Sequence, residues 1–203
     1  MNAFIQKIGL LTVAIILGFG ETQAQTPQKW EIDKSHASVN FSVNHFFSTV
    51  TGKFKKFEGE FYFDANNLAE SKITFTVFVK SVDTDEDERD EHLQSKDFFN
   101  AEEFETMQFV SAKIERKNDK EYILHGNLTI RGTTKTVALP MKIKGIIDNP
   151  WQDEKVIMGI AIHTTLDRTD YGVGTGSWAA TAIVGDEVTV DVHMELDGLK
   201  ARL

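Results

Sequence analysis

Apolar and polar residues alternate with a period of two along most of this chain. The clearest stretch lies near the end, where polar residues separate the apolar positions Val188, Val190, Val192, Met194 and Leu196. Such alternation is typical of a β-strand with one buried face and one solvated face. The pattern therefore predicts an all-β protein made of long antiparallel strands.

About eight such stretches follow one another, joined by short turns such as residues 117–120 and 131–132. Phe54 and Phe57 lie at an even and an odd position of one stretch, so a regular strand would place their rings on opposite faces. We therefore expect a bend or bulge near Lys55 and Lys56 that brings both rings to one face. Closure into a barrel is favoured over an open sheet because long open strands leave exposed edges. A two-sheet sandwich stays an alternative.

Residues 1–24 have the composition of a secretory signal peptide. Lys7 lies in a positive n-region, residues 8–19 form an apolar h-region, and Ala24 ends a small-residue cleavage site. The apolar run is shorter than the ~20 residues that span a bilayer, so cleavage near Ala24 is favoured over a retained membrane anchor. We therefore expect residues 25–203 to form a single soluble domain that is periplasmic or otherwise exported.

Charge and composition narrow the function classes further. The formal net charge is −9, which disfavours nucleic acid as a partner because phosphates repel an acidic surface. The chain has no cysteine, so its fold is expected to hold without disulfides. It has 15 Phe against three Tyr and three Trp, and phenyl rings supply apolar surface without a polar group that needs a partner.

Residues 81–100 interrupt the alternation and carry helix signals. Thr84 or Asp85 is expected to cap a short helix, and carboxylates follow in its first turn, where the helix dipole favours them. The stretch ends in Phe98 and Phe99, which a solvated loop has no reason to carry. We expect these rings to close one end of an apolar container. Residues 168–182, which include three glycines and Trp178, are expected to form an irregular loop.

Motifs for catalysis or metal binding are incomplete. Asp83, Asp85 and Asp87 have the spacing that opens an EF-hand loop, but Glu88 stands at the glycine position and Gln94 at the bidentate glutamate position. The six histidines lack the i, i+4 helical spacing of a zincin, and the chain has no Gly-x-Ser-x-Gly nucleophile elbow. We expect no catalytic residue, no metal site and no cofactor.

Several ordered motifs resemble the YceI-like family between Trp30 and about Leu196. They include residues 30–33 (WEID) followed by Ser35 and His36, residues 89–93 (RDEHL), 97–99 (DFF), 126–132 (GNLTIRG) and 167–172 (DRTDYG). The resemblance implies a lipocalin-like antiparallel barrel of about eight strands with a short helical cover. It also implies an exported protein that binds a long-chain isoprenoid lipid or a quinone-like amphiphile, and a carrier rather than an enzyme.

The apolar strand faces and the cover supply the candidate ligand-binding residues. They are Phe41, Phe61, Phe63, Ile73, Phe75, Phe98, Phe99, Phe109, Leu124, Met158, Ile160 and Trp178. The alternative is an ordinary packed core, because a barrel of eight strands can be filled by its own side chains.

Five polar residues in the motifs are candidates for a rim that meets a ligand head group. They are His36, Arg89, Asp90, His92 and Arg168. A structural polar network is one alternative, and an enzyme acting on the head group through the histidines, Arg89 and Asp90 is another. A homodimer is left open.

Overall fold

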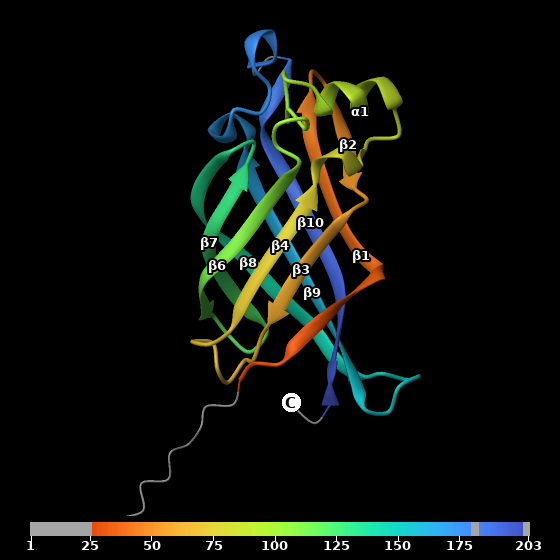
Figure 1. Cartoon of the computed structure of the whole chain (residues 1–203), viewed down its shortest axis with the longest axis vertical. Helices are drawn as coiled ribbons and strands as arrows, with labels where there is room; N and C mark the ends of the chain where they lie inside the picture. The colour runs from red at the N-terminus through yellow and green to blue at the C-terminus, as the bar shows by residue number, and fades with distance from the viewer. Residues whose placement is uncertain (1–25, 180–182, 201–203) are drawn as a thin grey trace, which may run out of the picture.

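The alternating stretches form strands that close into an antiparallel barrel (Figure 1), in a computed structural model that describes residues 26–179 and 183–200. The sheet order is β10-β9-β8-β7-β6-β4-β3-β1-β2-β5, and pairing of β10 with β1 closes the barrel. The strands are β1 (Lys29–His45), β2 (Ser48–Phe54), β3 (Phe57–Tyr62), β4 (Lys72–Phe78), β5 (Val82–Asp83), β6 (Thr106–Arg116), β7 (Glu121–Ile130), β8 (Thr133–Asp148), β9 (Lys155–Asp167) and β10 (Val184–Leu199). The predicted barrel is confirmed, and the sandwich alternative is wrong.

The ten strand segments correspond to eight barrel strands. β2 and β3 are two halves of one strand that breaks at Lys55 and Lys56, and β5 follows β4 after a single 3-10 turn, η1 (Val79–Ser81). Phe54 and Phe57, on either side of the break, are both buried. The bend expected from their opposite parities is therefore confirmed.

The pairing that closes the barrel joins β1 to β10 and contains one large irregularity. Asp33 is opposite Glu195, yet the next pair is Ala37 with Met194. Residues 34–36 therefore form a bulge in β1 with no partner residues in β10. The bulge lets β1 bend, and the strand then pairs with β3 at its beginning and with β2 in its second half.

The end of the barrel at which β10 terminates is filled by side chains, and this part is called the floor below. Tyr122, Met158 and Leu196 are among the most completely buried residues there. The indole Nε1 of Trp30 donates a hydrogen bond of 2.9 Å to the carbonyl of Phe63, whose ring meets Tyr122 edge-on at 5.2 Å. The floor closes this end with a packed core.

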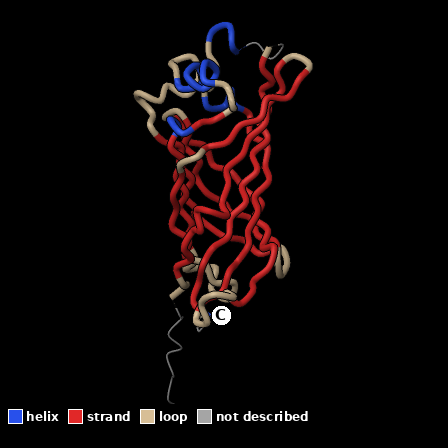
Figure 2. The backbone as a smooth tube through the Cα atoms, turned by 90° about the vertical axis from the view of Figure 1, so that its right-hand side faces the viewer, coloured by secondary structure: helices blue, strands red, loops and turns tan. Residues whose placement is uncertain are grey.

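The opposite end carries the helices (Figure 2). Besides η1, they are α1 (Asp87–Gln94) and the 3-10 turns η2 (Arg168–Tyr171) and η3 (Gly176–Ala179). Residues 180–182 of the expected irregular loop lie outside the described residues. The expected cap is corrected: Glu86 caps α1 by accepting hydrogen bonds from the backbone N–H groups of Glu88 and Arg89. Among the described residues, none of the helices has the length and apolar composition needed to cross a bilayer.

Candidate functional site

An apolar cavity of about 230 Å³ lies between the floor and the helical end of the barrel. Its walls come from almost every strand, because alternate residues of each strand point inward. Nine of the twelve predicted ligand-binding residues line it: Phe41, Phe61, Ile73, Phe75, Phe98, Phe99, Phe109, Leu124 and Ile160. The packed-core alternative therefore describes only the floor.

Sequence reasoning also missed several residues that line the cavity. They include Val39, Phe54, Leu93, Ile130, Leu139 and Val173. Strand parity could have found some of them, because Ile130 continues the inward parity of Leu124 along β7. Leu93 and Val173 lie outside the strands, so alternation gives no signal for them.

Three predicted ligand-binding residues lie elsewhere. Phe63 and Met158 belong to the floor, where Phe63 packs on Tyr122 and Met158 is almost fully buried. Trp178 lies in η3, and its ring packs outside the cavity against Phe98 at 5.7 Å. These three residues do not line the cavity in this structure, and their contact with a ligand stays a prediction.

The segment after α1 closes the cavity. Phe98 is buried between His92 and Trp178, with ring centroids 5.0 Å from His92 and 5.7 Å from Trp178. Phe99 meets Phe54 of β2 edge-on at 6.0 Å. Both phenylalanines also border the cavity, so residues 98–99 join the cover to the barrel wall. All eight residues of α1 itself are exposed or half-buried.

Arg89 and Asp90 fasten the cover to the barrel through one threonine. Thr84 donates both its backbone N–H and its hydroxyl to Oδ1 of Asp90, at 2.9 and 2.6 Å. Nε of Arg89 donates to Thr84 Oγ1 at 2.8 Å, and Nη2 donates to the Thr84 carbonyl at 2.7 Å. Thr84 is buried and follows β5 directly. For Arg89 and Asp90, these contacts match the structural polar network that the sequence offered as an alternative to head-group binding.

Arg168 organises the loop beside the cavity. It is 6% exposed, and its Nε, Nη1 and Nη2 atoms all donate hydrogen bonds. The acceptors are the carbonyl oxygens of Val173, Gly174, Trp178, Val184 and Gly185 and the Oδ1 atom of Asp186. A guanidinium has five N–H groups, so these partners leave no donor over for a head group.

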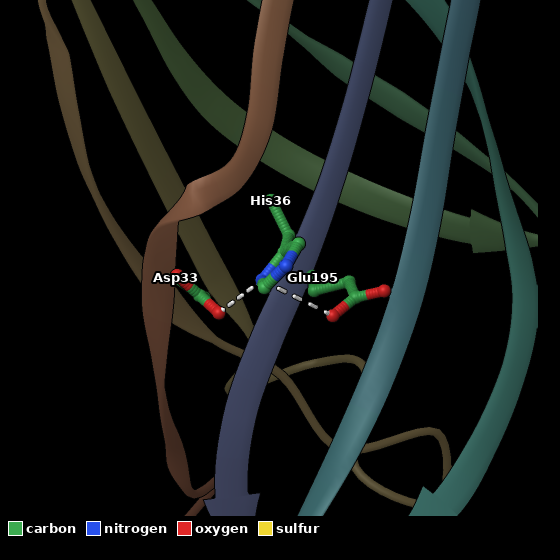
Figure 3. A group of neighbouring side chains, drawn as sticks. All are labelled: Asp33, His36 and Glu195. Atoms are coloured by element: carbon green, nitrogen blue, oxygen red, sulfur yellow. Dashed lines mark hydrogen bonds and ion pairs between the residues drawn. The ribbon is translucent and has the colours of Figure 1, made fainter.

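The fifth rim candidate, His36, lies in a different part of the molecule. It is exposed in the β1 bulge, on the outer surface, beside Asp33 and Glu195 (Figure 3). His92 instead lies in α1, within the cover, and packs on Phe98. The described structure thus does not bring His36 together with Arg89, Asp90 and His92.

Two sets of groups have shifted pKa values near these features. The hydrogen bond with Asp33 raises the pKa of His36 and lowers that of Asp33. At the edge of the cavity, burial raises the pKa of Tyr171, and the charge of Asp170 adds to the effect. Asp167, which accepts hydrogen bonds from Thr169, has a lowered pKa. Tyr171, at the cavity edge, is thus held neutral.

The fold and the cavity define a class: a closed β-barrel with an apolar interior, packed at one end and covered by a short helix at the other. Residues 30–196 match the model of the YceI-like domain. The chain belongs to this family. A UPF0312 protein of Vibrio vulnificus is 33% identical over 167 residues, covering 82% of this chain and 83% of the relative. One from Photorhabdus laumondii is 37% identical over 145 residues, covering 71% and 74%.

Solved structures show the same barrel. Burkholderia cenocepacia BcnA superposes with a TM-score of 0.72 at 27% identity, covering 81% of this chain and 99% of that one. The Campylobacter jejuni YCEI protein gives 0.64 at 28% identity, covering 73% and 85%. A polyisoprenoid binding domain from Saccharophagus degradans, implicated in plant cell wall breakdown, gives 0.63 at 11% identity, covering 86% and 99%. This last likeness is one of fold alone.

Proposed function

We propose that this protein binds the hydrocarbon chain of a long-chain amphiphile, of the polyisoprenoid or isoprenoid-quinone type, inside the barrel. The observation that carries the proposal is the apolar cavity lined by Phe41, Phe75, Phe109 and their neighbours. Burial of a hydrocarbon chain contributes about 0.8 kcal/mol per methylene, so such a cavity binds by length and shape rather than by polar contacts.

The volume of the cavity adds a condition to this proposal. About 230 Å³ lies below the roughly 300–1,000 Å³ typical of pockets for drug-sized ligands. A long chain therefore needs more room than the barrel offers in this conformation. Leu93, Phe98 and Phe99 are lining residues that belong to the cover rather than to a strand. We therefore propose that this segment moves outward when a long chain enters.

The family supports a binding role, and one structural relative suggests the ligand class. The domain from Saccharophagus degradans is described as polyisoprenoid binding. The proposal extends that ligand class to this chain because both barrels have the same fold and this one is hollow and apolar. A head group would then lie near the cover, where Arg168 and Arg89 are already engaged by the protein itself.

Extraction and uptake test the proposal. Organic extracts of the purified protein, analysed by mass spectrometry, should contain a stoichiometric long-chain lipid, and delipidated protein should take up an isoprenoid quinone or a polyprenyl phosphate. Phe75→Asp, which places a charge in the cavity wall, should abolish uptake. Phe47→Asp is the matched control, because Phe47 is 107% exposed at the tip of the β1–β2 hairpin. A protein that stays empty with both probes contradicts the proposal.

The signal-like composition of residues 1–24 supports a place of action outside the cytoplasm. We propose that residues 1–24 are removed during export and that the protein carries its lipid through an aqueous compartment such as the periplasm. N-terminal sequencing of the protein from a cell fractionation should give Gln25 as the first residue. Light scattering of the same sample distinguishes a monomer from the homodimer that the sequence leaves open.

A further inference from the structure

A second recess lies on the outside of the barrel, where β1 bulges. It has a volume of about 380 Å³ and is bordered by Asp33, His36, Glu195 and Asp197 together with the loop between β8 and β9. Figure 3 shows Asp33 and His36 of β1 on one side and Glu195 of β10 on the other, with the imidazole between the two carboxylates. The lipid cavity shares none of these residues.

The three side chains present ligand atoms to one point. His36 Nδ1 lies 2.7 Å from Asp33 Oδ2 and 3.8 Å from Glu195 Oε2. One ligand atom of each residue lies within 4.8 Å of the other two. Zn²⁺ holds imidazole nitrogen and carboxylate oxygen at about 2.0–2.2 Å, so small rotations bring all three atoms to ligand distance. The side chains are partly exposed, which leaves them room to rotate.

The β1 bulge creates this arrangement. Without it, Lys34 would follow Asp33 in register and pair with Met194, and His36 would lie further along β10 from Glu195. The bulge instead returns His36 to Asp33. The backbone N–H of Ser35 donates to Asp33 Oδ1 at 2.8 Å, so Oδ2 is the atom that faces the imidazole. Orientation of a ligand by such an outer hydrogen bond is typical of metal sites.

The charges around the recess favour a cation. Asp33, Glu195 and Asp197 are carboxylates, and among the described residues that border the recess His36 is the only group that can become positive. Asp197 accepts a long hydrogen bond of 3.5 Å from Asn149 and adds to the negative potential. A divalent cation among these groups would offset the surplus negative charge.

We propose that Asp33, His36 and Glu195 bind Zn²⁺, with water from the recess completing the coordination. Imidazole nitrogen with carboxylate oxygen suits zinc, whereas Ca²⁺ and Mg²⁺ take oxygen ligands almost throughout. The sequence predicted no zinc site because the histidines lack the i, i+4 spacing of a helical zincin motif. The three ligands proposed here instead come from two strands that are far apart in the chain. The site is separate from the lipid cavity and does not depend on the proposed function.

Calorimetric titration of the purified, metal-free protein with ZnCl₂ tests this site. We expect one saturable site in the wild-type protein and at least about a tenfold loss of affinity in His36→Ala and in Glu195→Gln. His163→Ala is the matched control. His163 Nδ1 lies 2.6 Å from Asp191 Oδ1 on the same outer surface, so it is an exposed histidine–carboxylate pair outside this three-residue group.

Two further measurements make the outcome decisive. Zinc should raise the melting temperature of the wild-type and His163→Ala proteins but not that of His36→Ala. Uptake of an isoprenoid quinone should be the same in all three proteins, which separates this proposal from the lipid-binding one. The proposal is wrong if the wild-type protein shows no saturable zinc site, or if His163→Ala weakens zinc binding as much as His36→Ala does.

Discussion

Nη2 of Arg168 donates a hydrogen bond of 2.8 Å to the carbonyl oxygen of Val184, the first residue of β10. The same guanidinium also donates hydrogen bonds to the carbonyl oxygens of Val173 and Trp178. One buried side chain therefore joins η2, the loop after it and the beginning of β10. Because Val173, Val184 and Arg168 itself line the cavity, this side chain sets the shape of its upper wall.

Replacement of Arg168 by Ala should cost about 3–5 kcal/mol in free energy of unfolding, because several buried carbonyls lose their donor and Asp186 loses its charge partner. Arg168→Lys should fall between this variant and the wild type, since an ammonium lacks the planar fork. Urea denaturation measures both. Arg116→Ala is the control: its partner Asp119 is exposed, so the change should stay within about 1 kcal/mol. Equal effects at both positions would contradict the structural role of Arg168.

Met158 and Ile160 point into the same barrel from β9 but should respond differently to mutation. Met158→Ala creates a void in the packed floor and should cost about 2–5 kcal/mol while leaving quinone uptake intact. Ile160→Phe extends into the cavity and should reduce uptake with a smaller loss of stability. Chemical denaturation and quinone uptake, measured on both variants, check the boundary between floor and cavity. If Met158→Ala folds fully but loses uptake, the cavity extends down to Met158 and the floor begins below it.

Gly52 lies where β2 passes between the cavity wall and the cover. A Cβ atom there would collide with the Phe41 ring and would lie 2.7 Å from Cγ2 of Thr84. Gly52→Ala should therefore cost about 1–3 kcal/mol and weaken uptake, because it displaces a lining ring and the threonine that holds Arg89 and Asp90. Gly145→Ala, whose Cβ would meet nothing within 4 Å, is the matched control and should be nearly neutral. Thermal melts and quinone uptake compare the two.

Local pattern predicted the long antiparallel strands, the cost of exposed edges favoured their closure, and the family resemblance implied the barrel. Alternation specifies which side chains share a face, so the strands, the bend at Lys55 and Lys56 and nine of the residues that line the cavity followed from the sequence. Alternation does not specify how far along the barrel axis an inward-facing side chain lies. Met158 and Ile160 share a face, yet one lies in the floor and the other in the cavity wall, because strand register across the whole barrel decides their level.

The polar residues were harder to predict for a related reason. Arg168 and Arg89 have acceptors that are mostly backbone carbonyls, and a backbone carbonyl leaves no trace in the sequence. His36 was grouped with His92 because both lie in motifs. A three-residue bulge in β1 places His36 outside the barrel instead, and a bulge of that kind depends on pairing with a strand about 160 residues further along.

The pKa of Tyr171 gives the cavity edge a dependence on alkaline pH. Burial disfavours the phenolate, and the nearby charge of Asp170 disfavours it further, so the folded-state pKa lies above the ordinary value of 10.0. Between these two values the folded protein keeps a proton that the unfolded chain has lost. The stabilisation from neutral Tyr171 is therefore complete below about pH 10 and is lost as the pH rises through the folded-state pKa.

Absorbance titration of the phenolate, taken as the difference between wild type and Tyr171→Phe, should show a tyrosine that ionises above pH 10. Asp170→Asn should bring that midpoint partway down, because the burial of the ring remains. Unfolding free energies above pH 10 should fall more steeply for the wild type than for Tyr171→Phe, which has no proton to lose. Quinone uptake should weaken over the same range, since a phenolate beside Val173 would put charge at the cavity edge. A Tyr171 midpoint at or below 10 would show that this ring is solvated and the cavity open there.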